Sequence, residues 1–160
     1  MVNISTQNVL AENNIFKQGH GVSIGSETSG WVRNVVIRNS ECHGTNTGVR
    51  IKSCRGRGGG VENVLYDGMT GSVGEAIQLT LDYCKSAPTN VTATPLIRNV
   101  TLRNINLTAT SQYLTCEGLS DSPIQDITLE NVWVSNKDKQ DCGQCSGAVK
   151  GHVSPRPCFA

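Results

Sequence analysis

A short motif that recurs along the chain limits the folds this sequence can adopt. Each copy has Asn or Asp, then a β-branched residue and a short strand-forming stretch, and usually ends in a second Asn. The five copies cover residues 8–13, 34–39, 63–68, 99–104 and 126–131. Their starts lie 26, 29, 36 and 27 residues apart. A period of this size is typical of solenoids, in which each unit buries its apolar side chains against its neighbours.

A second strand signal follows each of the first four copies, 14 or 15 residues after its start. These strands are VSI at 22, VRI at 49, IQL at 77 and YLT at 113. Two strands per unit, with Gly-rich and polar turns between them, predict an all-β fold, a right-handed parallel β-helix of about five coils. Like strands would stack about 4.8 Å apart, and Asn at equivalent turns would form a ladder that satisfies backbone groups. The alternative is a β-sandwich, but a sandwich does not require one motif at one phase in five successive units.

Length and charge narrow the organisation of the protein. A chain of 160 residues is long enough for one domain with a real core, so we expect a single β-helix domain over residues 1–160. Residues 136–160 hold three cysteines and would form a disulfide-rich C-terminal cap on the last coil. The net charge of +1 gives no general attraction to nucleic acid or acidic membranes, and no apolar run is long enough to span a membrane. We expect a monomer without a metal or other cofactor.

Seven cysteines favour an oxidising compartment and disulfide bonds over metal or redox roles. Because the count is odd, one thiol is free or its partner is missing. Cys142 and Cys145 form a CxxC, but no second CxxC or His pair completes a zinc site. Four N-x-S/T sequons, which fit a secreted glycoprotein, begin at Asn3, Asn90, Asn99 and Asn106. The N-terminus holds no apolar signal region, so we expect that the front of the protein is absent.

Two cations alternate with apolar residues in the strand at 49–52. If Val49 and Ile51 point into the core, Arg50 and Lys52 point outward, side by side. Two cations two residues apart form a fork for carboxylates, and Arg can bind a carboxylate through two parallel hydrogen bonds. A solvated charge pair on a strand surface is the more ordinary interpretation of Arg-x-Lys taken alone.

One of the three histidines lies between two glycines, just before the second strand of the first coil. The glycines around His20 permit close approach of a ligand or a tight backbone, and an ordinary turn with an exposed His is an equal alternative. In a β-helix the outer face of the second strands would form a long groove suited to a polymer. Aligned on this face, coil by coil, are His20 and Ser23, Arg50 and Lys52, and Gln78 and Thr80.

Four stretches, in order along nearly the whole chain, resemble the polygalacturonase family, glycoside hydrolase family 28. They are GHGVSIGSETSG (19–30), GTNTGVRIKSCRGRGG (44–59), AIQLTLDY (76–83) and CEGLSDSPIQDITLENV (116–132). The resemblance implies inverting hydrolysis of α-1,4-galacturonosyl bonds in pectin, by a protein of the extracellular space or cell wall, without a cofactor. It further implies that Arg50 and Lys52 hold a substrate carboxylate and that His20 lies beside the catalytic carboxylates. Tyr83 matches an active-site tyrosine, although the surrounding LTLDYC departs from the commonest pattern.

The catalytic acids of the family have no counterpart in these 160 residues. Inverting hydrolysis needs a carboxylic acid and a water-activating carboxylate about 6.5–9.5 Å apart. The resemblance implies that they come from an Asn-Thr-Asp segment and an Asp-Asp pair upstream of GHG, and neither occurs here. We therefore expect the C-terminal portion of a pectin hydrolase, with its substrate-holding residues and without its catalytic aspartates. The alternative is a noncatalytic β-helix that binds pectin or another acidic polysaccharide. Endo or exo action, and a rhamnogalacturonan substrate, stay open.

Overall fold

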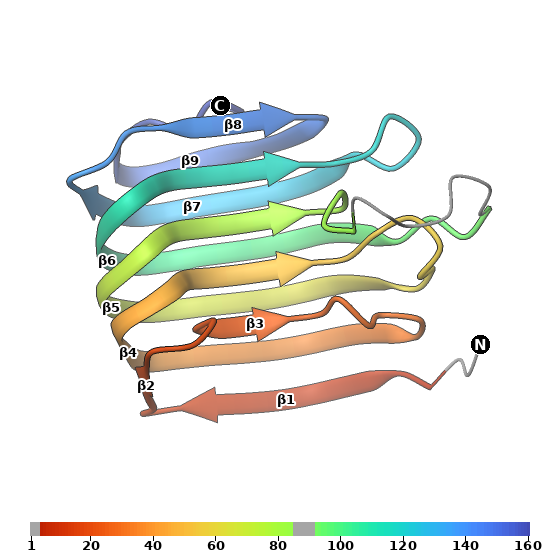
Figure 1. Cartoon of the computed structure of the whole chain (residues 1–160), viewed down its shortest axis with the longest axis horizontal. Helices are drawn as coiled ribbons and strands as arrows, with labels where there is room; N and C mark the ends of the chain where they lie inside the picture. The colour runs from red at the N-terminus through yellow and green to blue at the C-terminus, as the bar shows by residue number, and fades with distance from the viewer. Residues whose placement is uncertain (1–3, 85–91) are drawn as a thin grey trace.

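Parallel strands make up most of the computed structural model, which describes residues 4–84 and 92–160 (Figure 1). The strands are β1 (Thr6–Glu12), β2 (Ile15–Lys17), β3 (Val22–Ile24), β4 (Trp31–Lys52), β5 (Gly60–Thr80), β6 (Leu96–Glu117), β7 (Ile124–Ser135), β8 (Gln140–Gly143) and β9 (Cys145–Ser154). They pair in the order β1-β4-β5-β6-β7-β9, with β2 and β3 also on β4 and β8 on β6. Within the described ranges, no helix is long and apolar enough to cross a membrane. The predicted parallel β-helix is confirmed.

Each central coil of the solenoid is one long, bent strand. β4, β5 and β6 have 22, 21 and 22 residues and pass from the first repeat strand into the second without a break. β1, β2 and β3 together form the first coil, and β7 with β8 forms the fifth. The count of coils agrees with the prediction. Figure 1 shows the rungs stacked in chain order from red to blue, with β9 as a last rung beside β7.

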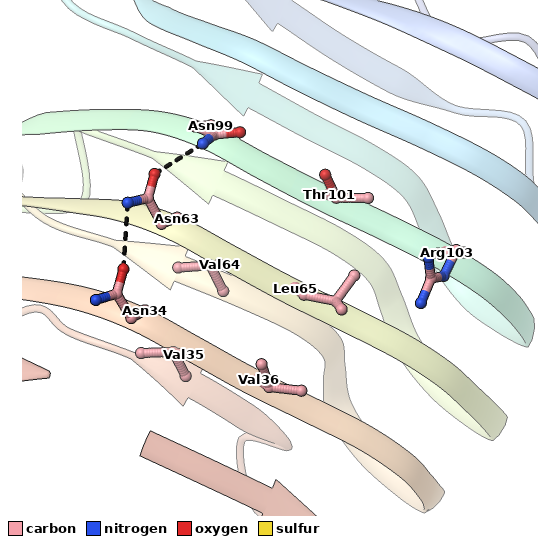
Figure 2. A pocket seen from close by; sticks show the side chains of 9 residues that line it. All are labelled: Asn34, Val35, Val36, Asn63, Val64, Leu65, Asn99, Thr101 and Arg103. Atoms are coloured by element: carbon pink, nitrogen blue, oxygen red, sulfur yellow. Dashed lines mark hydrogen bonds between the residues drawn. The ribbon is translucent and has the colours of Figure 1, made fainter. Parts of the chain in front are cut away.

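The repeat asparagines lie where the backbone turns through the left-handed region. Asn8, Asn34, Asn63 and Asn99 have φ of 59°, 55°, 58° and 52°. Asn tolerates this conformation better than most residues, which explains why the motif keeps it. Their side chains form the predicted ladder, in which the amide nitrogens of Asn34, Asn63 and Asn99 donate to the amide oxygen one coil earlier, at 3.1, 3.2 and 2.7 Å. Figure 2 shows the second and third of these bonds. The ladder borders a shallow surface pocket of about 390 Å³ on the first-strand side.

One of the four sequon asparagines, Asn99, belongs to the ladder. The side-chain nitrogen of Asn99, the atom to which a glycan would attach, donates to Asn63 at 2.7 Å. Asn106 is exposed on the outer side of β6. Asn3 and Asn90 lie outside the described residues.

The core runs along the axis of the solenoid, where apolar residues of successive coils stack. Val49, Ile51 and Ile77 are fully buried, and Val22 pairs with Val49 and Val49 with Ile77 in the predicted register. In the fourth second strand, Leu114, the second residue of YLT, pairs with Ile77. A register shift between β5 and β6, just before this point, displaces the pairing by one residue.

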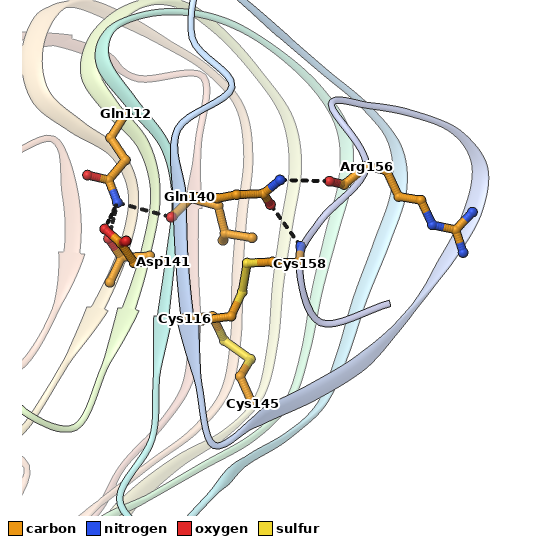
Figure 3. The surroundings of a disulfide bond; sticks show 10 residues. Gln112, Cys116, Gln140, Asp141, Cys145, Arg156 and Cys158 are labelled. Carbon is orange, nitrogen blue, oxygen red and sulfur yellow. Dashed lines mark hydrogen bonds between the residues drawn. A yellow bond between two sulfur atoms is a disulfide. The ribbon is translucent and has the colours of Figure 1, made fainter.

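Three disulfides close the turns and the C-terminal end: Cys54–Cys84, Cys116–Cys145 and Cys142–Cys158. The two CxxC cysteines therefore pair with other partners rather than with each other. Cys42 is the free thiol, fully buried in the core. Within the predicted cap, β8 and β9 continue the ladders of β6 and β7, so much of residues 136–160 is itself part of the solenoid. Figure 3 shows how Cys116–Cys145 and the segment around Cys158 close this end.

Candidate functional site

The outward side of the second strands forms one continuous surface across five coils, which we call the second-strand face. Parallel register places one outward residue per coil in a row, because like positions stack directly above one another. This row is Ser23, Arg50, Gln78, Thr115 and Asp141. A second row, two residues further along, contains Lys52, Thr80, Glu117 and Gly143. The register thus aligns mostly polar residues at a regular spacing, although Arg50 and Thr80 are themselves buried.

Alternation along β4 sets the direction of the two cations. Val49 and Ile51 are fully buried in the core, so Arg50 and Lys52 project from the opposite side of the strand, as predicted. The two differ in exposure. Lys52 is partly exposed, whereas Arg50 is only 8% exposed, although it points away from the core. Its burial follows from its contacts with Gln78 and Tyr83 on the neighbouring coil.

Tyr83 completes a cluster with these cations. The Lys52 Nζ atom lies 4.0 Å from the centre of the Tyr83 ring, and the Arg50 guanidinium carbon lies 5.2 Å from it. Hydrogen bonding by Lys52, and then the charges of Lys52 and Arg50, lower the pKa of the Tyr83 hydroxyl. Tyr83 is 40% exposed and Lys52 is partly exposed, so the cluster presents an aromatic ring and one cation to solvent together. Cations and a hydroxyl-bearing ring can bind a sugar that carries a carboxylate.

Local structure holds Tyr83 in this place. Its backbone N–H donates to the carbonyl of Ser53 at 3.2 Å, and an antiparallel bridge joins Cys54 to Asp82. The Cys54–Cys84 disulfide ties the residue after Tyr83 to the turn that follows Lys52. A cross-link therefore flanks the contact between ring and cations.

Sequence reasoning missed a pair of hydrogen bonds behind Arg50. The Arg50 Nε atom donates to the Gln78 side-chain oxygen at 2.6 Å, and the Gln78 amide nitrogen donates to Glu75 Oε2 at 2.9 Å. The strand alignment predicts Gln78 as a neighbour of Arg50. It carries no signal for Glu75, which lies at a register shift between β5 and β6.

His20 makes its hydrogen bonds with residues outside the cationic cluster. Its Nδ1 atom is 3.2 Å from the Asn46 amide nitrogen, and the Ser23 hydroxyl donates to its backbone carbonyl at 3.3 Å. Among the described contacts, none joins the His20 ring to Arg50 or Lys52. Gly21 has a structural reason, because a Cβ atom there would lie 1.8 Å from the Thr47 carbonyl oxygen. His20 itself is exposed at the start of the second-strand face.

The far end of this face, where strands β5, β6 and β8 end, is more acidic than the region around Arg50 and Lys52. A depression of about 380 Å³ has Asp82, Glu117 and Gln144 among its lining residues. The two arginines of the adjacent turn do not add free positive charge, because Arg55 binds Asp121 through two hydrogen bonds of 2.8 and 2.5 Å, and Arg57 pairs with Glu27. Among residues 4–84 and 92–160, no group of three His, Cys, Asp or Glu side chains could hold a metal ion.

Fold and face together define a parallel β-helix protein with an open, partly cationic strand surface suited to an extended polymer. The model of the glycosyl hydrolases family 28 matches residues 1–154, and the chain belongs to this family. It is 29% identical to polygalacturonase QRT2 of Arabidopsis thaliana, over 94% of this chain and 37% of the relative. It is 30% identical to a polygalacturonase of Malus domestica, over 94% and 35%, and 30% identical to an exopolygalacturonase of Cochliobolus carbonum, over 90% and 38%. The chain thus spans little more than a third of the length of these relatives.

Proposed function

We propose that this chain binds galacturonate units of pectin on its second-strand face, as the substrate-holding part of a polygalacturonase. Membership of glycosyl hydrolases family 28 makes a pectin-degrading glycosidase the coarse assignment. The observation that supports the finer one is the cluster of Arg50, Lys52 and Tyr83. Three disulfides agree with an extracellular place of action.

The cluster suits a uronic acid better than a neutral sugar. A galacturonate unit carries one carboxylate, and a hydrogen bond from Lys52 or Arg50 to that group would be charge-assisted. The Tyr83 ring lies beside the cations and offers an apolar surface to the sugar ring. A neutral hexose offers only hydroxyls to the same side chains, so the cations would gain much less from it.

Hydrolysis requires groups beyond this cluster. An inverting enzyme uses an acid for the leaving oxygen and a carboxylate that activates water, held on opposite sides of the bond. The family motifs that supply them do not occur in this sequence. In the proposal, Arg50, Lys52 and Tyr83 hold the substrate, and His20 lies on the adjacent coil, toward those acids.

Calorimetric titration of the chain with trigalacturonate, beside the matched neutral galactose trimer, tests the proposal. We expect binding of trigalacturonate that weakens as salt rises, because the contact joins partly exposed charges, and little binding of the neutral trimer. Equal affinity for both trimers, or none for trigalacturonate at low salt, would refute a carboxylate-binding face.

A further inference from the structure

Arg50 is held from behind by two hydrogen bonds in series. Its Nε atom donates to the Gln78 side-chain oxygen at 2.6 Å, and the Gln78 amide nitrogen donates to Glu75 Oε2 at 2.9 Å. Among the described residues, Nε makes the one hydrogen bond of good geometry from the Arg50 side chain; the guanidinium also lies against Tyr83, whose pKa it lowers. The two Nη atoms are therefore the donors left for a substrate carboxylate.

Glu75 is placed to decide which way the Gln78 amide faces. A glutamine side chain can present either its oxygen or its nitrogen to a neighbour, and Arg50 requires the oxygen because a guanidinium only donates. An ionised carboxylate only accepts, so it requires the nitrogen of the same amide. With Arg50 on one side and Glu75 on the other, only one orientation satisfies both.

The surroundings of Glu75 agree with a positioning role. Its Oε1 atom is buried and has no hydrogen-bond partner of good geometry in the described residues, so Oε2 makes its one such contact, to Gln78. Burial raises the pKa of the Glu75 carboxyl; the charge of Asp141 raises it further, while the Thr115 hydroxyl, the charge of Arg50 and Gln78 lower it. A half-buried carboxylate needs such a reason, because burial disfavours its charged form.

We propose that Glu75 and Gln78 are positioning residues that orient Arg50 so that its Nη atoms face the carboxylate of a bound galacturonate unit. The inference rests on the proposed function. It adds two residues, neither of which would touch the substrate, to the group of residues that recognises the substrate carboxylate.

The first test removes the acceptor for Arg50. Gln78→Leu should weaken trigalacturonate binding about fivefold or more, because Arg50 loses the bond that orients it. The matched control is Gln125→Leu, which removes the same residue type from an exposed position of β7, outside the second-strand face. This control should keep affinity within about twofold. Unchanged affinity in Gln78→Leu, or equal losses in both variants, overturns the inference.

The second test separates orientation from simple charge repulsion. Glu75→Gln keeps an acceptor oxygen for Gln78, whereas Glu75→Leu removes it and frees the amide to turn its nitrogen toward Arg50. We expect Glu75→Gln to bind trigalacturonate at least as well as the wild type and Glu75→Leu to bind several-fold more weakly. If Glu75 acted only by repelling the anionic substrate, both variants would bind more tightly, and that result would contradict the inference.

A readout without substrate keeps the two proposals distinguishable. In ¹⁵N NMR of the wild-type chain, the Arg50 Nε–H should be protected from exchange, and its shift should follow the titration of Glu75. Rapid exchange with no response to Glu75 overturns the inference even if a variant fails to fold. Absence of trigalacturonate binding with a protected Arg50 Nε–H would instead refute the proposed function.

Discussion

At the scale of single residues, the three tyrosines occupy two different electrostatic environments. Tyr66 and Tyr113 are fully buried, and burial raises the pKa of both hydroxyls. Tyr83 is exposed beside two cations, and Lys52 and then Arg50 lower its pKa. A buried phenol resists ionisation because its charged form loses hydration, whereas a neighbouring cation stabilises that form.

This difference predicts the alkaline titration of the protein. Followed by phenolate absorbance, one tyrosine should ionise below the usual value of about 10, and the other two only as the chain unfolds. Lys52→Ala should move the first midpoint upward, because it removes the largest cause of the shift. Lys150→Ala, which removes an exposed lysine from β9, serves as the control and should leave the midpoint unchanged. A first midpoint that ignores Lys52 would contradict the cluster.

Residue alternation predicted that Arg50 and Lys52 point outward side by side, and the structure brings both into contact with Tyr83. The burial of Arg50 could not be predicted, because it depends on side chains from the next coil and from the turn after it. The contact of Glu75 with Gln78 was not predicted from the sequence for a related reason. Its position follows from a register shift that local periodicity does not encode.

At the scale of elements, the asparagine ladder fixes the bend at which each coil begins. Asn63 lies in its middle, accepting from Asn99 and donating to Asn34, with φ of 58°. The ladder could be predicted because every unit repeats its residue at one phase. The shift that pairs Leu114 with Ile77 could not, because one extra residue in a polar stretch leaves the apolar pattern nearly unchanged.

Asn63→Ala should therefore lower the free energy of unfolding by about 2–4 kcal/mol, from two lost hydrogen bonds and a strained left-handed alanine. Asn63→Gly should cost less, because glycine adopts the positive φ without strain. Asn8→Ala, at the end of the ladder with one side-chain bond, should also cost less. Urea denaturation of the three variants measures these differences. Equal effects at Asn8 and Asn63 would show that the ladder does not contribute as described.

Two of the disulfide bonds stabilise different parts of the protein. Cys54–Cys84 flanks Tyr83, whereas Cys142–Cys158 closes the C-terminal end. Replacing either pair by serine should lower stability by about 2–4 kcal/mol. Only loss of Cys54–Cys84 should return the pKa of Tyr83 toward its usual value and weaken trigalacturonate binding, which absorbance titration and calorimetry measure. The same two changes on loss of Cys142–Cys158 would argue that the contact depends on overall stability alone.

At the scale of the whole molecule, five coils present the proposed binding face, and neither an Asn-Thr-Asp segment nor an Asp-Asp pair occurs among the 160 residues. The fold class was predictable because the repeat, the two strand signals and the turn residues all agree. The finer activity could not be predicted, since the chain spans little more than a third of the length of these relatives.

The chain alone should therefore not hydrolyse polygalacturonate at a measurable enzymatic rate. Each missing proton-transfer group typically contributes about 10²–10⁴-fold to the rate. A reducing-sugar assay on the purified chain, beside a full-length polygalacturonase as positive control, measures this. Turnover comparable to the control would mean that carboxylates within these residues, such as Asp82 and Glu117 in the far depression, perform the chemistry.

Recognition of the substrate carboxylate by Lys52 and Arg50 is most directly tested by calorimetric titration of trigalacturonate into Lys52→Ala, beside Lys150→Ala and the wild type. Loss of a charge-assisted bond costs about 1.5–3 kcal/mol, so Lys52→Ala should bind at least tenfold more weakly. Its melting temperature should stay close to that of the wild type, because Lys52 points away from the core. Affinity of Lys52→Ala within about twofold of the wild type, or an equal loss in Lys150→Ala, would contradict the account.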